Sequence, residues 1–246
     1  MAHITKIEPD NIKDSVVEIR YESKMPFPLV VGVVFDKLKN TFQLVNQNPN
    51  SGSFKFPINN ESQIQIEQSE TILHDNVITI KLNPGTIIFN CLNAYPLWPT
   101  YFSKIREVLE IIYEAQIFAS VNRIGLRYIN EYLDQKIEDI VNLEFKFGIP
   151  DATSHLVNIK TEFNFQNHLV ILTLIKTAGT KKVSEDKTVI PVSYVDIDVI
   201  QQNLDLKNLD EVLQIIDEAH NVEKILFFNR LLKKEHLSNL KITSNE

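Results

Sequence analysis

The stretch Ala119–Tyr132, ASVNRIGLRYINEY, decides the fold class, because apolar and polar residues alternate along it with the period of a β-strand. It follows Tyr101–Gln116, where apolar residues recur every three or four positions and predict an amphipathic helix. Strands in hairpins with helices after them indicate antiparallel sheets with helices packed on one face. The sequence therefore predicts the α+β fold class.

Hairpins are predicted on both sides of this stretch. Upstream, Val77–Lys81 and Thr86–Leu92 are separated by the turn signal Asn83-Pro84-Gly85. Downstream, Leu156–Phe165 and Leu169–Thr177 meet at a turn. The remaining expected elements are strands at Ser15–Glu22, Gln63–Glu67, Leu143–Gly148 and Val189–Ile200, helices at Leu29–Leu44, Asp134–Asn142 and Leu209–Asn229, and polar loops at Asn46–Ser53 and Gly179–Lys187.

The order of these elements indicates two units, each made of antiparallel strands and helices. The boundary is expected near Leu133–Ile140, which gives an N-terminal α+β sub-domain at residues 1–135 and a C-terminal one at residues 136–246 that ends in a long helix. No linker separates them in the sequence. We therefore expect two antiparallel-sheet/helix sub-domains that share one compact body.

Composition and charge restrict the class of protein. The chain has 246 residues, and its 43% hydrophobic and 23% charged residues are ordinary values for a globular protein. A net charge of −7 disfavours general binding to nucleic-acid backbone. The single cysteine, Cys91, excludes an internal disulfide and fits a reducing compartment. Because the sequence shows neither a signal-peptide stretch nor a membrane-length apolar run, it predicts a cytoplasmic protein without membrane attachment.

The central strand also carries a candidate site. Ile124, Leu126 and Tyr128 alternate on one face and predict a core stripe, whereas the other face carries Arg123 and Arg127 with a glycine between them. Arginine suits two-point contacts with carboxylate or phosphate, and glycine leaves room for a ligand beside the backbone. This face predicts an anion-binding site.

A second candidate lies in Tyr194–Val199, YVDIDV, where Asp196 and Asp198 share the polar face of a strand. Two such carboxylates can hold a hard divalent cation such as magnesium, although the pattern alone has low specificity. The cofactor is otherwise unknown. If the two strands are neighbours, the arginines could instead pair with these aspartates in a structural ion-pair network to which Glu18 and Arg20 contribute.

The histidines form no zinc-binding pattern, and the sequence contains no nucleophile elbow, P-loop or dinucleotide-binding glycine motif. His220, on the expected last helix, is either a buried, hydrogen-bonded histidine or a general base facing a cleft. The sequence thus identifies no catalytic residue and leans against an enzyme.

Several segments in order carry a resemblance to a known family: VVEIR at 16–20, Tyr95–Phe102 before the helix, RIGLRYIN at 123–130, YVDIDV at 194–199, and Ala219-His220 followed by Phe227-Phe228. Nearly the whole chain resembles a sporadically distributed family of uncharacterised prokaryotic proteins of about this length. The resemblance supplies no catalytic residues. It places Arg123, Arg127, Tyr128, Asn130, Asp196, Asp198 and His220 within the family's motifs, and we take Tyr128, Asn130 and His220 as further ligand-binding candidates. The patchy distribution resembles that of genes on mobile elements, including anti-phage defence loci.

Three functions follow as hypotheses. The first is a non-enzymatic binding or accessory protein that engages a protein partner or self-associates, in a mobile-element or anti-phage defence system. The second is a metal-dependent enzyme acting on nucleotide or nucleic-acid phosphates. In it, Arg123 and Arg127 hold phosphate, Asp196 and Asp198 hold the metal, and His220 shuttles a proton. The third is a sensor of a small anionic ligand or nucleotide that uses the arginine face without turnover.

Overall fold

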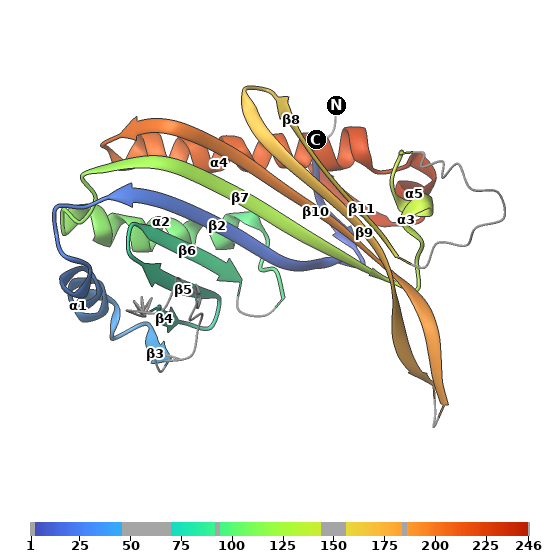
Figure 1. Ribbon diagram of the computed structural model, residues 1–246, viewed down its shortest axis with the longest axis horizontal. Helices are drawn as coiled ribbons and strands as arrows, with labels where there is room; N and C mark the ends of the chain where they lie inside the picture. The colour runs from blue at the N-terminus through green and yellow to red at the C-terminus, as the bar shows by residue number, and fades with distance from the viewer. Residues whose placement is uncertain (1–2, 46–69, 92–93, 144–155, 184–185, 246) are drawn as a thin grey trace, which may run out of the picture. The chain divides into compact units, whose positions relative to one another are not determined.

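The computed structural model describes residues 3–45, 70–91, 94–143, 156–183 and 186–245 (Figure 1). The chain forms two compact units. Unit 1 comprises Met1–Val16, Gly125–Gln201 and Gln214–Glu246, and unit 2 comprises Val17–Ile124 and Gln202–Leu213. Three strands and one helix contribute residues to both units: β2 (Ile12–Glu22), β7 (Ser120–Leu133), β10 (Asp186–Leu206) and α4 (Leu209–Leu226).

Unit 2 is built on a sheet in the order β3-β4-β5-β6-β2-β7. Its further elements are α1 (Phe27–Leu38), β3 (Gln43–Val45), β4 (Thr71–His74), β5 (Ile78–Asn83), β6 (Thr86–Cys91) and α2 (Trp98–Glu114). The β5–β6 hairpin turns at Gly85, whose φ of +72° favours glycine because a side chain is strained in the left-handed region. The buried Tyr101 of α2 donates its hydroxyl to the Phe89 carbonyl of β6 at 2.8 Å, which ties helix to sheet.

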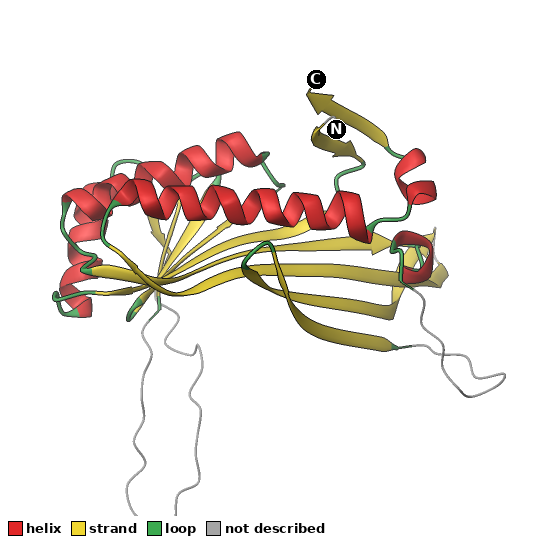
Figure 2. Ribbon diagram, turned by 90° about the horizontal axis from the view of Figure 1, so that it is seen from above, coloured by secondary structure: helices red, strands yellow, loops and turns green. Residues whose placement is uncertain are grey.

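Unit 1 contains a sheet in the order β2-β7-β10-β9-β8 and a two-stranded sheet of β1 and β11. Its further elements are β1 (His3–Glu8), α3 (Ile137–Ile140), β8 (Val157–Phe165), β9 (His168–Val183), the π-helical turn η1 (Phe227–Leu231), α5 (Lys234–Ser238) and β11 (Lys241–Asn245). Helix α4 runs along one face of the strands (Figure 2). Its apolar stripe is buried, as the three-to-four-residue spacing of Ile216, Ala219 and Val222 requires.

Most sequence expectations for the described residues are confirmed. The antiparallel β5–β6 and β8–β9 hairpins, the helix beginning near Tyr101 and the long strand at 120–133 are all present. The α+β class is therefore correct. The expected loop at Asn46–Ser53, the strand at Gln63–Glu67 and most of the strand at Leu143–Gly148 lie outside the described residues. The compact units do not follow the division expected near residue 135, and independent sub-domains with that boundary stay a prediction.

Two expectations are wrong. The helix expected at Leu29–Leu44 ends at Leu38, and the strand β3 occupies Gln43–Val45. The segment Gly179–Lys187 is no polar loop: β9 continues to Val183 and β10 begins at Asp186. The ladder runs without a break from Ile200 opposite Leu169 to Asp186 opposite Val183. Charged residues can take part in the backbone hydrogen bonds of an antiparallel ladder, so their presence does not end the ladder here. Within the described residues, no helix is long and apolar enough to cross a membrane.

Candidate functional site

Arg127 and Asp196 form a two-point ion pair between neighbouring strands of unit 1. Arg127 Nε donates to Asp196 Oδ1 at 2.8 Å, and Nη2 donates to Oδ2 at 2.6 Å, which is the strong fork geometry of arginine with a carboxylate. The hydrogen bonds with Asp196 raise the pKa of Arg127 above its ordinary value; partial burial opposes this, and the Asp196, Asp198 and Asp14 carboxylates add to it. The guanidinium that the sequence assigned to an external anion thus already holds a carboxylate of the protein.

Arg123 has a carboxylate partner as well, in unit 2. Its Nη1 donates to Glu18 Oε1, which also accepts a hydrogen bond from Arg20 Nε at 2.8 Å. The structural ion-pair network suggested by the sequence expects contacts of this kind between arginines and carboxylates. Arg123, however, binds Glu18 and not an aspartate. A ligand-binding role for the two arginines stays a prediction.

The metal-binding hypothesis rests on Asp196 and Asp198, which occupy alternate positions of β10 and share one face of that strand. Asp196 is engaged by Arg127, and Asp198 lies close enough to that arginine to affect its pKa. Across the part of the chain that the structure describes, no group of three or more histidine, cysteine, aspartate or glutamate residues is placed to hold a metal ion. A metal site at these aspartates therefore stays a prediction.

The pair belongs to a larger surface, which we call the polar face of unit 1. Three rows of directly opposite residues cross β10, β9 and β8: Asp198, Ile171 and Glu162; Asp196, Thr173 and Lys160; and Tyr194, Ile175 and Asn158. The alternation of β7 adds Arg127, Ile129 and Glu131, and that of β2 adds Asp14. The isoleucines are half-buried, whereas Lys160 and Glu162 are exposed. The face therefore combines apolar and charged side chains.

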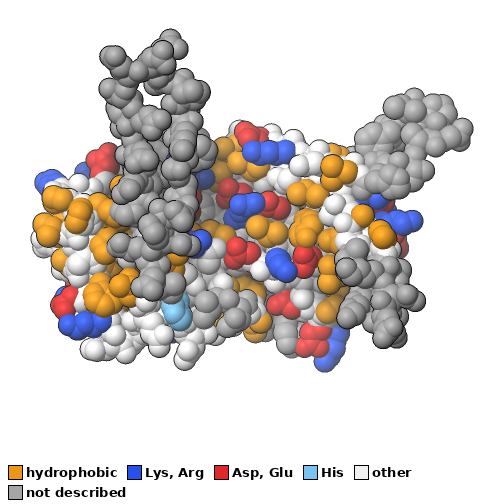
Figure 3. All heavy atoms as spheres, turned by 60° about the horizontal axis from the view of Figure 1, so that its bottom comes forward, with side chains coloured by type: hydrophobic (Ala, Val, Ile, Leu, Met, Phe, Trp, Pro, Cys, Tyr) orange, Lys and Arg blue, Asp and Glu red, His pale blue; other side chains and the backbone are white. Residues whose placement is uncertain are grey.

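Hydrogen bonds fix the end of this face near Tyr194. The Tyr194 hydroxyl donates to Glu131 Oε1 at 2.7 Å, and Lys13 Nζ donates to Glu131 Oε2 at 3.1 Å. The tyrosine hydrogen bond lowers the pKa of Glu131, and the lysine contributes in the same direction. The view in Figure 3 shows basic, acidic and hydrophobic side chains interspersed over one side of the molecule.

Tyr128 and Asn130 lie on the opposite side of the unit 1 sheet from Arg127, and His220 of α4 faces the same side. All three are buried, and a 3.2 Å hydrogen bond joins Tyr128 Oη to His220 Nδ1. Burial lowers the pKa of His220 to about 3, and the positive charge of Lys224 adds to this effect. The imidazole is therefore neutral at pH 7. The candidate residues of unit 1 thus form two groups on opposite faces of β7, with Arg127 in one and Tyr128 in the other.

Sequence reasoning missed three members of the buried group: Tyr132, Glu223 and His236. Burial raises the pKa of Glu223 to about 8, although nearby Lys224 opposes the shift. Burial also raises the pKa of Tyr132, and the Glu223 and Asp10 charges add to it. The Tyr132 and His236 rings meet edge to face, with 5.6 Å between their centroids. The only sequence signal for these residues was their spacing. Tyr132 lies four residues after Tyr128 on the strand, and Glu223 lies three after His220 on the helix, so each shares a face with the earlier residue.

The two most strongly shifted groups of this buried cluster, His220 and Glu223, are largely uncharged at neutral pH. His220 is unprotonated and Glu223 is mostly protonated, so both side chains are uncharged or nearly so at pH 7. A carboxylic acid and a neutral imidazole of this kind can donate and accept hydrogen bonds without the cost of a buried charge. The hydroxyl of Tyr132 and Nε2 of His236 are buried atoms without a hydrogen-bond partner.

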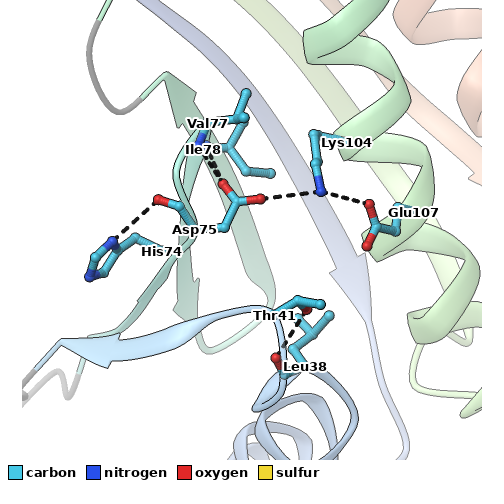
Figure 4. Close-up of polar contacts among 8 residues, drawn as sticks. All are labelled: Leu38, Thr41, His74, Asp75, Val77, Ile78, Lys104 and Glu107. Atoms are coloured by element: carbon cyan, nitrogen blue, oxygen red, sulfur yellow. Dashed lines mark hydrogen bonds and ion pairs between the residues drawn. The ribbon is translucent and has the colours of Figure 1, made fainter.

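A third polar cluster, in unit 2, has a structural role (Figure 4). The Asp75 carboxylate accepts hydrogen bonds from the backbone N–H groups of Val77 and Ile78 at 2.6 and 2.7 Å. It also pairs with Lys104 of α2 at 3.3 Å, and Lys104 contacts Glu107 at 2.9 Å. Asp75 thereby closes the β4–β5 turn and links it to the helix, which accounts for its half-buried position.

Comparison of the chain with protein-family models and with curated proteins finds no match. The family resemblance drawn from the sequence motifs stays a prediction, and the function must be argued from the geometry.

Proposed function

We propose that this protein is a non-enzymatic binding protein, an accessory or regulatory subunit that recognises a protein partner through the polar face of unit 1. The observation that carries the proposal is the Arg127–Asp196 fork, whose side chains are 45% and 13% exposed. A guanidinium held by an internal carboxylate has less capacity for a small anion, yet its planar surface still supports contacts with another protein. This favours partner recognition over anion capture.

The composition of the surrounding face supports the same function. Arginine and tyrosine are enriched in protein–protein interfaces, and Arg127 and Tyr194 are both held in place by hydrogen bonds with carboxylates. Ile171 and Ile175 lie between these polar groups on the central strand β9. Apolar contacts flanked by already ordered polar groups lose little conformational entropy on binding, which favours association.

The proposal is tested with Thr173→Lys, which places a long cationic side chain in the middle row of the face. The matched control is Thr161→Lys on β8, an exposed threonine whose partner Leu172 lies on the other side of the sheet. Each protein is expressed in its native host and captured by an affinity tag, and bound proteins are quantified by mass spectrometry. We expect a stoichiometric partner that Thr173→Lys weakens by about tenfold or more, a loss typical of a buried interface position, while Thr161→Lys retains it.

Equal retention of the partner by both variants would assign binding to another surface and contradict the proposal. Circular dichroism of both variants separates loss of binding from loss of folding. Membership of a mobile-element or anti-phage defence system remains an expectation from the resemblance. The identity of the captured partner tests it directly.

A further inference from the structure

The strand β8 forms one border of the unit 1 sheet. Among the strands that the structure describes, it pairs only with β9, and Figure 2 shows the β8–β9 hairpin at the side of the sheet. The ladder between them runs without a break from Val157 opposite Lys176 to Phe165 opposite His168. The outer side of β8 is therefore a regular, nine-residue row of backbone groups. An edge of this kind can pair with another strand.

The turn of this hairpin determines which backbone groups point outward. Gln166 and Asn167 have positive φ angles of 47° and 65°, as in the two-residue turns that close hairpins. Such a turn makes Phe165 and His168 a hydrogen-bonded pair, so alternate residues from Phe165 back to Val157 bond to β9. The N–H and C=O groups that point away from β9 belong to the residues between them: Asn158, Lys160, Glu162 and Asn164.

The charges of this edge permit pairing with a suitable strand. β8 contains no proline and no break in register, two features that commonly prevent the pairing of edges. Its charged side chains, Lys160 and Glu162, have opposite signs and are 60% and 57% exposed. Within the strand, Lys160 Nζ and Glu162 Oε1 lie 3.9 Å apart, an exposed contact that contributes little to stability. Both charges are therefore available to a strand that presents the opposite charge to each.

The sequence of β8, VNIKTEFNF, is complementary to itself when two copies run antiparallel about Thr161. Thr161 then lies opposite its own copy, and the other opposite pairs are Lys160 with Glu162, Ile159 with Phe163, Asn158 with Asn164, and Val157 with Phe165. An opposite-charge pair and two pairs of an aromatic with a β-branched residue stabilise neighbouring strands. The four outward residues form hydrogen-bonded pairs in this register, and the apolar side chains of both copies meet on one side of the joined sheet.

The neighbouring registers are less favourable. Because outward backbone groups must lie opposite outward groups, the next possible registers place either Lys160 or Glu162 opposite its own copy. Both put like charges directly opposite each other, which destabilises a strand pair. The charge pattern therefore selects the register about Thr161.

We propose that two copies of this chain pair β8 with β8, antiparallel about Thr161, and thereby form a symmetric dimer in which the two unit 1 sheets are continuous. The two-fold axis passes between the two Thr161 residues, so each contact occurs twice and the assembly is closed. The inference goes beyond the proposed function, because the interface is a strand edge. Since Lys160 and Glu162 belong to the polar face of unit 1, pairing joins the polar faces of the two copies.

The test measures molar mass by light scattering after size exclusion, over a series of protein concentrations. The wild type should form a dimer. Lys160→Glu and Glu162→Lys should each weaken it by about tenfold or more, because each variant puts like charges opposite each other at two positions. The double variant Lys160→Glu/Glu162→Lys exchanges the charges and should restore the dimer, as should a mixture of the two single variants.

Lys207→Glu is the matched control. Lys207 also forms an exposed ion pair with a carboxylate two residues away, Asp205 of unit 2, at 3.1 Å, and its substitution changes the net charge as Lys160→Glu does. The control should leave the dimer intact. Hydrogen exchange supplies a backbone measurement: the amides of Lys160 and Glu162 should exchange slowly in the wild-type dimer and rapidly in the two single variants.

A wild type that is monomeric at every concentration overturns the inference. The same holds for a dimer that both single variants leave unchanged, for a double variant that stays monomeric, and for a dimer in which the Lys160 and Glu162 amides exchange rapidly.

These outcomes are separable from those of the proposed function. Thr161→Lys puts two lysines opposite each other at the axis, so it should weaken the dimer and still retain the partner bound by the polar face. A monomeric wild type that captures a partner in a Thr173-dependent way would overturn the β8 dimer and leave the proposed function standing.

Discussion

Glu223 shows at the scale of one residue how an interior can accommodate an ionisable group. The residue is 5% exposed. The charge of Lys224 acts on the pKa of Glu223, and a charge on Glu223 in turn raises the pKa of Tyr132. Removing a carboxylate from water is costly, so the group keeps its proton up to about pH 8. A buried acid of this kind lowers stability whenever it must ionise, and strongly shifted groups are frequent at functional sites.

The protonation of Glu223 predicts a pH dependence of stability. The ordinary glutamate pKa of 4.5 applies to the unfolded chain, so the folded protein binds the extra proton between pH 4.5 and about 8. Wild-type stability is therefore expected to fall as pH rises through this window and to level off above it, by about 1.4 kcal/mol for each pKa unit. Glu223→Gln cannot titrate and should escape this loss.

The measurement is the free energy of unfolding in urea for both proteins from pH 4 to 9. The advantage of Glu223→Gln over the wild type should grow between pH 4.5 and 8 and then stay constant. His220, whose pKa is lowered, reduces stability as pH falls below 6.5, but it does so in both proteins and cancels from the difference. A difference independent of pH would show that Glu223 ionises normally in the folded state.

Residue-scale features were only partly predictable from the sequence. The two-residue period placed Tyr128 in the core and Asp196 on the opposite face, as the structure has them. Glu223 could not be predicted, because glutamate in a helix is ordinarily solvated and its burial depends on packing between distant segments. The particular partner of Arg123, Glu18, likewise depends on which strand is adjacent to β7, which no local pattern specifies.

At the scale of elements, the pairing of β9 with β10 depends on close packing at Gly179. Gly179 lies opposite Ile190, and a Cβ placed on it would approach Val192 Cγ2 to 2.6 Å. Val192 is 5% exposed and β-branched, so it has few ways to move aside. The sequence pattern of this region, with lysines, serine and acidic residues, indicated a loop. The physical reason for the error is that hydrogen bonding along a ladder can continue through polar residues.

Gly179→Ala should destabilise the protein by about 1–3 kcal/mol, a typical cost of overpacking. Val192→Ala removes the Cγ2 atom that the new methyl group would meet, so the double variant should recover part of the loss relative to the sum of the single variants. Urea unfolding of the four proteins gives this coupling energy. Additive effects would mean that no steric contact between the two positions exists in the folded protein.

At the scale of the whole molecule, the two compact units are interleaved along the chain. Each takes segments from both halves: unit 2 ends with Gln202–Leu213, and unit 1 begins with residues before Val17. The element order in the sequence indicated two units but could not reveal that they are interleaved. The division of β2, β7 and β10 between the two units depends on long-range strand pairing.

Interleaving predicts that neither half folds alone. Fragments 1–135 and 136–246, expressed separately, should each lack a cooperative unfolding transition and show the poorly dispersed amide spectra of unfolded chains, since each lacks strands that complete both sheets. Mixing the fragments should restore dispersed signals if the missing strands are supplied in trans. A cooperatively folded fragment on its own would show that one half is an autonomous sub-domain.

The pairing of β1 with β11 brings His3 opposite Asn245, at about the 4.8 Å spacing of adjacent strands. The segment from His3 to Asn245 therefore begins and ends at neighbouring positions of one small sheet. A few linking residues between positions 245 and 3 would close it, and new ends could then be opened at the exposed β8–β9 turn at Asn167. A label attached near position 3 or near position 245 would report on the same small region of unit 1.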